Sequence, residues 1–365
     1  MDFTLDDDLL ALQGLAREIL SDRATTARVR EVEISPIRVD DDLWTALAAS
    51  GLTGLAVPEA QGGAGLGLAA LCVLLEEQGR TVAPVPLWSQ ALASLVLGHE
   101  SDRHADLLEG MAAGSRRVTV ALEEYGVGDP CAPACRAVRD DGTWRLTGTK
   151  AAVPSPSGAG HVLVAATSDA GPGLFLVTAE APGVRWELMP VTTHDLAGEL
   201  VLESAMGEPV GGPGTLGAAV RLARILVCAL QVGVAEGALT LAASYLAERE
   251  QFGRPLGTFQ AVQHQLADCW IDIDAMAVTL WQAIAGSEAG SPDAKGSALV
   301  ASWWRAQGGL DVVHRVQHVH GGIGVDVDYP VHRYFLWGKQ LAGTLGGPAS
   351  LLADLGDVLA EGVGS

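Results

Sequence analysis

The chain has 365 residues, a formal net charge of −21, 48% hydrophobic residues and only 18% charged residues. This composition excludes an intrinsically disordered chain and predicts a globular protein large enough for two or three structural layers. The strongly acidic balance disfavours nucleic acid as a partner, because phosphate backbones attract basic surfaces.

Cysteine use and the N-terminus indicate the compartment. The five cysteines, at positions 72, 131, 135, 228 and 269, form no Cys-x-x-Cys pair, so we expect reduced thiols and no metal site on Cys131 and Cys135. The N-terminal segment MDFTLDDDLL lacks the basic region of a secretory signal. Apolar runs are interrupted by Gly, Pro or charge before 18 residues, which predicts no membrane span and no membrane partner. We therefore expect a cytoplasmic protein.

Residues 1–115 are predicted to be helical. Leucine and other apolar residues recur at helical spacing near residues 9–20, 43–49 and 68–78. A glycine-rich connection at residues 51–68 follows no strand and lacks a GKS or GKT sequence, so it indicates a structural loop rather than a phosphate cradle.

Residues 116–205 are predicted to form a small antiparallel sheet or barrel. Short β-branched, alternating runs are separated there by clusters of Gly, Pro and Asp. Helical periodicity returns after this region and continues to about residue 360, which predicts a helical C-terminal domain at residues 206–365.

The most informative stretch is residues 245–268, YLAEREQFGRPLGTFQAVQHQLAD. Glycine and proline residues from 253 to 257 separate two helical patterns, so Arg249, Gln251 and Phe252 are expected where a helix end frays into a turn. A guanidinium and free backbone amides at such a turn suit a phosphate group. The alternative is that Arg249 only stabilises the helix dipole while exposed to solvent.

Two motifs resemble those of the acyl-CoA dehydrogenase family. ER-x-QFG-x-P-x-x-x-FQ-x-x-Q-x-x-LAD at residues 248–268 is similar to the family signature, and QHVHGGIGVDVDYPVHRYF at residues 317–335 is similar to its second hallmark. The resemblance extends over nearly the whole chain. It implies an α+β fold with an N-terminal helical domain (1–115), a middle β domain (116–205) and a C-terminal four-helix bundle (206–365).

The resemblance also implies a cofactor, FAD, held between two subunits. One subunit supplies the β domain around the flavin ring, and its neighbour supplies the two motifs that reach the pyrophosphate and adenosine. Here His318 stands where the family usually has Gln, with Gln317 just before it. The cofactor-binding residues that the resemblance implies are Arg249, Gln251, Phe252, Gln317, His318, Gly321, Gly322 and Gly324. The spacing of His314, His318 and His320 could suggest a metal, but no carboxylate is placed with them, so no metal site is predicted.

The segments that face the flavin in the family are altered in this chain. The loop that resembles TEPGAGSD reads LEEYGVGDP at residues 122–130, and the segment after GTK, normally aromatic, reads AAVPSPSG at residues 151–158. Two prolines there remove backbone donors, and no aromatic side chain is left to stack on a ring. We therefore predict that no flavin ring lies against this chain's own β domain.

The catalytic glutamate of the family has no equivalent here. Its two alternative positions fall at Leu345 and at Ala223, and neither side chain can accept a proton. Glu123, Glu124 and Asp326 remain open as substitutes, with nothing in the sequence that favours one of them.

These observations predict a subunit of a heteromeric, FAD-dependent acyl-CoA dehydrogenase of the α2β2 kind found among actinobacterial steroid-degrading enzymes. It supplies the ADP side of an FAD site shared with a homologous catalytic subunit. An acyl-CoA is the expected substrate, and an electron-transfer flavoprotein is the expected electron acceptor. Two alternatives stay open: a self-sufficient homo-oligomeric flavoenzyme with an atypical base or a non-oxidative reaction, and a non-enzymatic assembly subunit.

Overall fold

The computed structural model describes residues 3–363 and divides the chain into two compact units. The first two residues of the N-terminal segment and the last two of the predicted C-terminal domain lie outside the described residues. The helical unit comprises the described parts of Met1–Thr26, Cys72–Ala83 and Val227–Ser365, and the sheet unit comprises Ala27–Leu71 and Pro84–Leu226. The bounds of the three domains expected from the sequence remain predictions.

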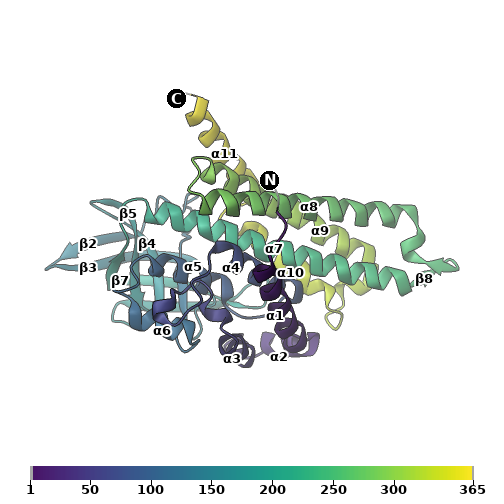
Figure 1. The fold of residues 1–365 in the computed structure, drawn as a ribbon, viewed down its shortest axis with the longest axis horizontal. Coiled ribbons are helices and arrows are strands. Elements are labelled where there is room, and N and C mark those ends of the chain that lie inside the picture. Colours follow the sequence, from purple (N-terminus) through teal and green to yellow (C-terminus); the bar gives the residue numbers. More distant parts are fainter. Residues whose placement is uncertain (1–2, 364–365) are drawn as a thin grey trace. The chain divides into compact units, whose positions relative to one another are not determined.

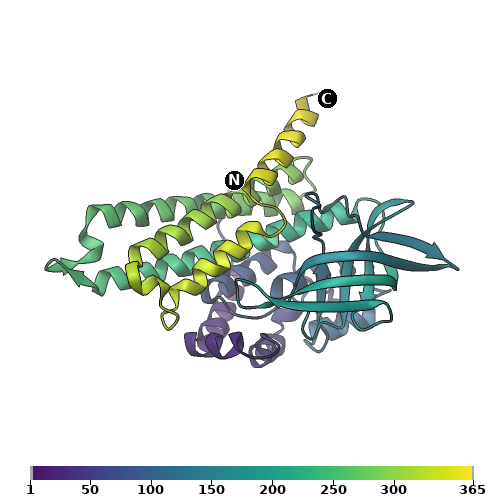
Figure 2. The ribbon, with the colours of Figure 1, turned by 180° about the vertical axis from the view of Figure 1, so that it is seen from behind.

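The sheet unit contains the seven-stranded sheet that Figure 2 shows. Pairing runs β4-β2-β3-β7-β5 and returns from β5 to β4, so these strands close into a small barrel, with β1 beside β4 and β6 beside β7. The pairs β1–β4 and β2–β4 are parallel, which corrects the expectation of a purely antiparallel sheet. Both pairs join strands that are not consecutive in the sequence. The alternation of apolar and polar residues predicts strands but not which distant strands pair. The strands are β1 (Val118–Ala121), β2 (Arg136–Asp140), β3 (Thr143–Pro154), β4 (His161–Ser168), β5 (Gly171–Thr178), β6 (Val184–Pro190) and β7 (Leu196–Val210).

Buried side chains from these strands fill the barrel. Leu146, Val164, Phe175 and Leu200 belong to one apolar cluster, as alternating strands with one buried face require. The helices of the sheet unit are α2 (Thr26–Glu33), which begins at the last residue of the helical unit, α3 (Asp41–Ala49), η1 (Leu52–Gly54), η2 (Glu59–Gln61), α5 (Leu87–Gly98) and α6 (Ala105–Ala112).

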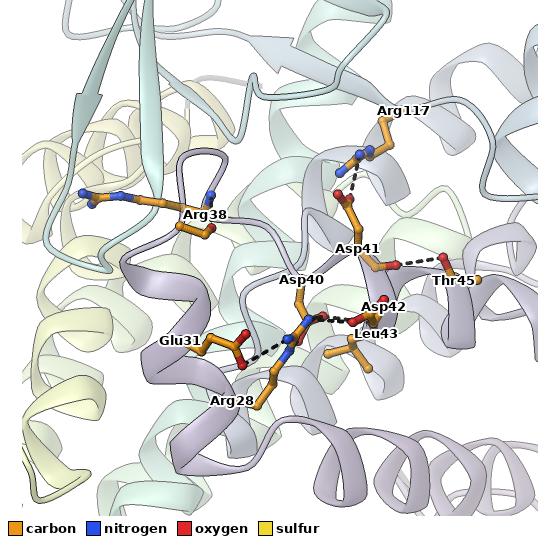
Figure 3. Close-up of polar contacts among 10 residues, drawn as sticks. Arg28, Glu31, Arg38, Asp40, Asp41, Asp42, Leu43, Thr45 and Arg117 are labelled. Carbon is orange, nitrogen blue, oxygen red and sulfur yellow. Dashed lines mark hydrogen bonds and ion pairs between the residues drawn. The ribbon is translucent and has the colours of Figure 1, made fainter.

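Asp40 begins α3 and holds α2 against it (Figure 3). Its carboxylate accepts the N–H of Leu43 at 3.1 Å and two guanidinium N–H bonds from Arg28 at 2.7 and 2.8 Å. Burial opposes ionisation of this carboxyl, but the bonds from Arg28 and Leu43 outweigh it and hold the pKa of Asp40 below its usual value. Asp40 is therefore both an N-cap and half of an ion pair.

Asp40→Asn is expected to lower the free energy of unfolding at pH 7 by about 1–3 kcal/mol, because Arg28 loses its only buried carboxylate partner among the described residues. Because the pKa of Asp40 is lower in the folded chain than in the unfolded chain, its ionised form stabilises the fold at pH values above the unfolded pKa of about 4. This stabilisation is lost as the pH falls through the folded pKa. The difference between the two proteins should therefore shrink in acid. Urea denaturation at pH 7 and below pH 4 measures it. Asp42→Asn, at an exposed carboxylate that contacts the same arginine, is the matched control and should change stability little.

The helical unit is built on long helices that lie side by side (Figure 1). α8 and α10 pack against α9, and α11 packs against its first half through Leu351 and Leu299. The first part of α4 and of α7 belongs to the sheet unit. The elements are α1 (Asp7–Arg23), α4 (Leu68–Thr81), α7 (Thr215–Glu248), β8 (Glu250–Gln251), β9 (Arg254–Pro255), η3 (Leu256–Thr258), α8 (Gln260–Glu288), α9 (Ala294–His320), η4 (Gly321–Val325), α10 (Val331–Gly343) and α11 (Pro348–Val363).

Glycines set how closely α4 and α7 approach each other within the helical unit. A Cβ on Gly233 would lie 1.9 Å from the carbonyl oxygen of Glu76, and one on Gly79 would lie 2.2 Å from that of Leu230. Only glycine permits this backbone contact. Next to it, the buried carboxylate of Glu77 accepts two bonds from Arg17, at 2.7 and 3.0 Å.

In residues 3–363 one helix, α7, is long and apolar enough to span a membrane by length and composition. Glycine and charged residues interrupt its apolar runs, as noted in the sequence, but its mean hydropathy still meets this criterion. In the structure 72% of its most apolar window is buried within the protein. A core helix meets the same criterion, so burial explains the composition of α7.

Candidate functional site

The first motif forms a short hairpin between α7 and α8. β8 and β9 pair through Glu250↔Pro255 and Gln251↔Arg254, and the two residues between them, Phe252 and Gly253, have φ values of 54° and 78°. Two positive φ values in a two-residue loop indicate a type I′ turn. The helix end and the turn expected from the sequence are therefore present, since α7 ends at Glu248, but the turn is a paired hairpin, about which helical periodicity carries no information.

The hairpin lies between the end of α7 and the start of α8 (Figure 1), and its side chains are mostly exposed to solvent. Phe252 is 90% exposed. Its backbone is in the left-handed region, which is unfavourable for a bulky residue. Arg249 and Gln251 are also exposed. The guanidinium of Arg254 lies 4.0 Å from the ring centroid of Phe259, which also meets Phe252 edge to face at 6.1 Å. In the part of the chain that the structure describes, no ion pair involves Arg249 or Arg254, although two glutamates lie close in sequence.

The second motif forms the end of α9 and the turn η4. The amide nitrogen of Gln317 donates to the carbonyl of Gly324, so this side chain closes the loop instead of pointing outward. His318 is exposed. Among the described residues, no atom lies within 4 Å of the position a Cβ would take on Gly321 or Gly322. The structure thus makes His318 and the two glycines accessible, and gives Gln317 an internal contact.

An aromatic cluster joins the two motifs. The ring of Tyr245 stacks on His320 at 4.8 Å and meets Tyr329 edge to face at 5.9 Å. The carbonyl of Tyr245 accepts the N–H of Arg249 at 2.9 Å, and His320 directly precedes Gly321. Sequence reasoning treated the motifs separately, whereas the structure places both beside one cluster.

The three histidines considered for a metal do not converge. His314 packs against Phe335 at 4.9 Å, whereas His320 bonds the carbonyl of Val316 inside the aromatic cluster. Burial lowers the pKa of His320, against the effect of that backbone bond, so its ring is neutral at pH 7. Residues 3–363 contain no group of three or more His, Cys, Asp or Glu side chains that could hold a metal ion.

In the sheet unit, Glu124 is engaged in an ion pair. Its carboxylate lies 2.5 Å from the ammonium nitrogen of Lys150, which is 0% exposed, and accepts the N–H groups of Ala134 and Cys135 at 2.7 and 3.0 Å. Burial favours the neutral acid, but these bonds outweigh it and lower the pKa of Glu124. A fully bonded, ionised carboxylate is a poor proton acceptor, so the geometry disfavours Glu124 among the three substitute bases.

The other two substitute bases have less defined surroundings. Asp326 is exposed and accepts the N–H of Asp328 at 2.9 Å. The backbone carbonyl of Glu123 accepts the N–H of Ala151 at 2.9 Å. A general base works best in a dry pocket that raises its pKa. Asp326, in solvent, lacks such a pocket.

The segment of residues 151–158 contains a distorted strand end. β3 continues to Pro154 through a bulge between Lys150 and Val153, and Ala152 and Ser155 have φ values of 50° and 40°. The hydroxyl of Thr119 donates to the carbonyl of Pro154 at 2.5 Å. β3 ends at Pro154, and the backbone is strained on both sides of this residue.

Asp195 is a carboxylate that sequence reasoning missed. The hydroxyl of Ser155 donates to one of its oxygens at 2.5 Å, and the N–H of Leu196 donates to the other at 2.7 Å. Burial raises the pKa of Asp195 to about 6, against the lowering effect of these bonds and of Arg38. No local pattern marks this residue, because its partner Ser155 lies in a different strand region.

The two residues at which the resemblance puts the family glutamate, Leu345 and Ala223, are both buried. Leu345 follows α10 at a φ of 57° and is buried, and the guanidinium of Arg305 donates to the carbonyls of Thr344 and Gly346 at 2.8 and 3.0 Å. Ala223 is buried within α7. The structure thus places neutral, buried side chains at both positions.

Comparisons with known proteins agree over nearly the whole chain. Models of the acyl-CoA dehydrogenase N-terminal and C-terminal domains match residues 6–115 and 212–352. The acyl-CoA dehydrogenase FadE27 of Mycobacterium tuberculosis is 37% identical over an alignment 376 positions long, which covers 99% of each chain. Among solved structures, a chain in a variant of the Tcur3481-Tcur3483 steroid ACAD is 60% identical with a TM-score of 0.96, covering 99% of this chain and 100% of that one. A chain of the ChsE4-ChsE5 complex from Mycobacterium tuberculosis is 36% identical with a TM-score of 0.93 and 99% coverage of both.

Proposed function

The chain belongs to the acyl-CoA dehydrogenase family, and we propose that it is the non-catalytic subunit of a heteromeric member. The complete enzyme oxidises an acyl-CoA thioester to its α,β-unsaturated form. FAD, which members of this family bind, supplies the acceptor for the hydride. The other subunit supplies the flavin pocket and the base.

One observation supports this proposal: the two motifs expose groups that suit a diphosphate and an adenosine, whereas the positions where the resemblance puts the base hold side chains that accept no proton. The accessible groups are a guanidinium without an ion pair among the described residues, Arg249, an exposed aromatic ring, Phe252, and two open glycines, Gly321 and Gly322. These groups fit a pyrophosphate and an adenosine, because a guanidinium binds phosphate oxygens in pairs and glycine admits close backbone approach. The family positions of the base hold Leu345 and Ala223.

In this mechanism the residues of the chain bind and position, and move no proton. Arg249 and Gln251 would hold the diphosphate side of FAD, Phe252 would shield it from water, and the loop at residues 317–324 would hold the adenosine. The ring contacts of Tyr245 with His320 and Tyr329 fix the position of the hairpin relative to the loop. Gln317, which bonds Gly324, acts through the shape of the loop.

Partner and substrate follow from the relatives. The Tcur3481-Tcur3483 and ChsE4-ChsE5 structures contain two different proteins by their names, and the first is called a steroid ACAD. We therefore assign a homologous acyl-CoA dehydrogenase subunit as partner in an α2β2 assembly, a steroid acyl-CoA as substrate and an electron-transfer flavoprotein as acceptor. The assembly acts in the cytoplasm.

The alternative function is a self-sufficient enzyme with an atypical base. Asp195 is the observation in its favour, because a half-buried carboxyl with a pKa of about 6 suits proton abstraction at neutral pH. Against it, Ser155 and the N–H of Leu196 already bond both of its oxygens.

Dye reduction with a steroid acyl-CoA separates the two functions. We expect no activity from the chain alone, full activity from the co-purified pair, and no loss of that activity in Asp195→Asn. Loss of the partner's glutamate base should abolish it. Acyl-CoA-dependent reduction by the isolated chain, removed by Asp195→Asn, would establish the alternative instead.

A further inference from the structure

A hollow of about 540 Å³ lies within the sheet unit, where α3 and α6 end. η1 packs against both helices and η2 packs against α6, so these four elements surround one space. A second hollow of about 370 Å³ shares Ala48, Ala49 and Ala113 with the first and extends along α3 to Thr45. Most of the wall of the first hollow consists of small residues, namely Ala48, Ala49, Gly51, Gly62, Ala112 and Ala113.

Two polar side chains in the first hollow, Gln61 and Glu109, have no partner among the described residues. Gln61, in η2, is 6% exposed, and its amide oxygen is buried without a hydrogen bond. Glu109, in the last turn of α6, is exposed and forms no ion pair there. Buried polar groups nearly always have a hydrogen-bond partner, and a missing one costs free energy. The hollow therefore contains one buried and one exposed oxygen acceptor that residues 3–363 do not use.

The hydrogen-bond donors around this space are already bonded within the protein. The N–H groups of Gly51, Gly62 and Ala113 each donate to a backbone carbonyl at 2.9 to 3.0 Å. In the second hollow, the hydroxyls of Thr45 and Ser115 donate to backbone carbonyls at 2.8 and 3.2 Å. Apart from the amide nitrogen of Gln61, the lining thus offers a ligand acceptors rather than donors.

The charge around the hollow is negative. α3 ends at Ala49 and α6 ends at Ala112, and the last carbonyl groups of a helix carry the negative end of its dipole. The carboxylate of Glu109 adds a full negative charge. The hollow therefore favours a cation that donates hydrogen bonds, and it disfavours a phosphate or a carboxylate.

The shape and the lining restrict the kind of cation. The methyl groups of Ala48, Ala49 and Ala113 line both hollows, and such an apolar surface suits methylene groups. The acceptors belong to different elements, which suits the three diverging donors of an ammonium group better than a planar guanidinium fork. The described residues offer no group of three metal ligands, so a metal ion does not fit.

We infer that this hollow binds a primary ammonium group carried on an aliphatic stem. The ammonium donates to the Glu109 carboxylate and the Gln61 amide oxygen, and the stem lies on the alanine methyl groups. A free alkyl diamine and a lysine side chain of another protein share this chemistry. The inference does not depend on the proposed function, because it uses no residue of the two family motifs.

Calorimetric titration of the full chain with cadaverine and with N-acetyl-lysine methylamide tests the site. We expect saturable binding of at least one probe, and the tighter one identifies the source of the ammonium group. Glu109→Gln should weaken binding about 10-fold or more, because a charge-assisted hydrogen bond is lost. Gln61→Leu should also weaken it without lowering the thermal melting temperature, since the amide oxygen has no partner within the described chain.

Two controls separate this site from general attraction of cations by a chain of net charge −21. Glu180→Gln removes an exposed carboxylate of the sheet unit outside the hollow and should leave the affinity at the wild-type value. Tetramethylammonium carries the same charge as a primary ammonium but no N–H donor, so it should not compete with either probe.

Three results would overturn the inference. The first is equal affinity in Glu109→Gln, Glu180→Gln and the wild type, and the second is effective competition by tetramethylammonium, because both indicate attraction by the acidic surface alone. The third is the absence of saturable binding for both probes. Loss of affinity in Glu109→Gln and Gln61→Leu, with none in Glu180→Gln, would support the site.

Discussion

Arg249→Ala is expected to remove most of the FAD from the co-expressed complex and to leave the two subunits associated. A charged hydrogen-bond donor to phosphate is worth about 1.5–3 kcal/mol, so the affinity for FAD should fall about 10- to 150-fold. Arg249 has no ion pair among the described residues, and its loss should therefore not disturb the fold. Flavin fluorescence during titration of the deflavinated complex measures the affinity.

The matched control is Arg139→Ala, which removes an exposed arginine from β2 in the sheet unit. It changes the net charge equally and should leave FAD affinity at the wild-type value. Equal FAD affinity in Arg249→Ala and Arg139→Ala would show that Arg249 only stabilises the end of α7. That is the alternative that its position in the sequence left open.

Lys150→Met is expected to lower the free energy of unfolding by about 3–5 kcal/mol at pH 7, because it leaves Glu124 buried without its partner. Adding Glu124→Gln should recover much of this loss, since the buried charge is gone. Lys295→Met, at an exposed lysine, is the control and should change stability little. Urea denaturation followed by circular dichroism measures all four proteins.

The pH dependence of this effect has a defined sign. In the wild type the lowered pKa of Glu124 contributes stability above its unfolded pKa of about 4.3, and this is lost as the pH falls through the folded pKa. Without Lys150, burial raises the folded pKa, so the variant loses stability as the pH rises above about 4.3. The difference should be largest at neutral pH and small near pH 4. A constant difference across this range would contradict the assignment of an ionised Glu124.

Much of the fold was predictable because long periodic segments dominate it. The helices at residues 7–23, 41–49 and 68–81 and the strands after residue 117 follow the expected pattern, and the α+β fold of this family is confirmed. The parallel pairing of β1 with β4 could not be predicted, because it depends on contacts between distant segments. The division into two compact units could not be predicted for the same reason, because each unit combines segments that are distant in the sequence.

The candidate site was predictable as motifs but not as geometry. Residue types located the hairpin and the glycine loop, whereas the stacking of Tyr245 on His320 that joins them required the tertiary structure. The type I′ turn at Phe252 was not predictable from helical periodicity, which carries no information about a two-residue turn. Asp195 was missed because its surroundings come from Ser155 in another strand region. The roles assigned to Arg249, Gln251 and Phe252 stay predictions.

The flavin content of the chain, purified alone and then with its homologous subunit, tests the central claim most directly. A shared site with only its ADP side on this chain predicts a colourless isolated protein and a yellow 1:1 complex with one FAD per heterodimer. One FAD per chain in the isolated protein would contradict it, because the flavin would then be held without the partner's β domain.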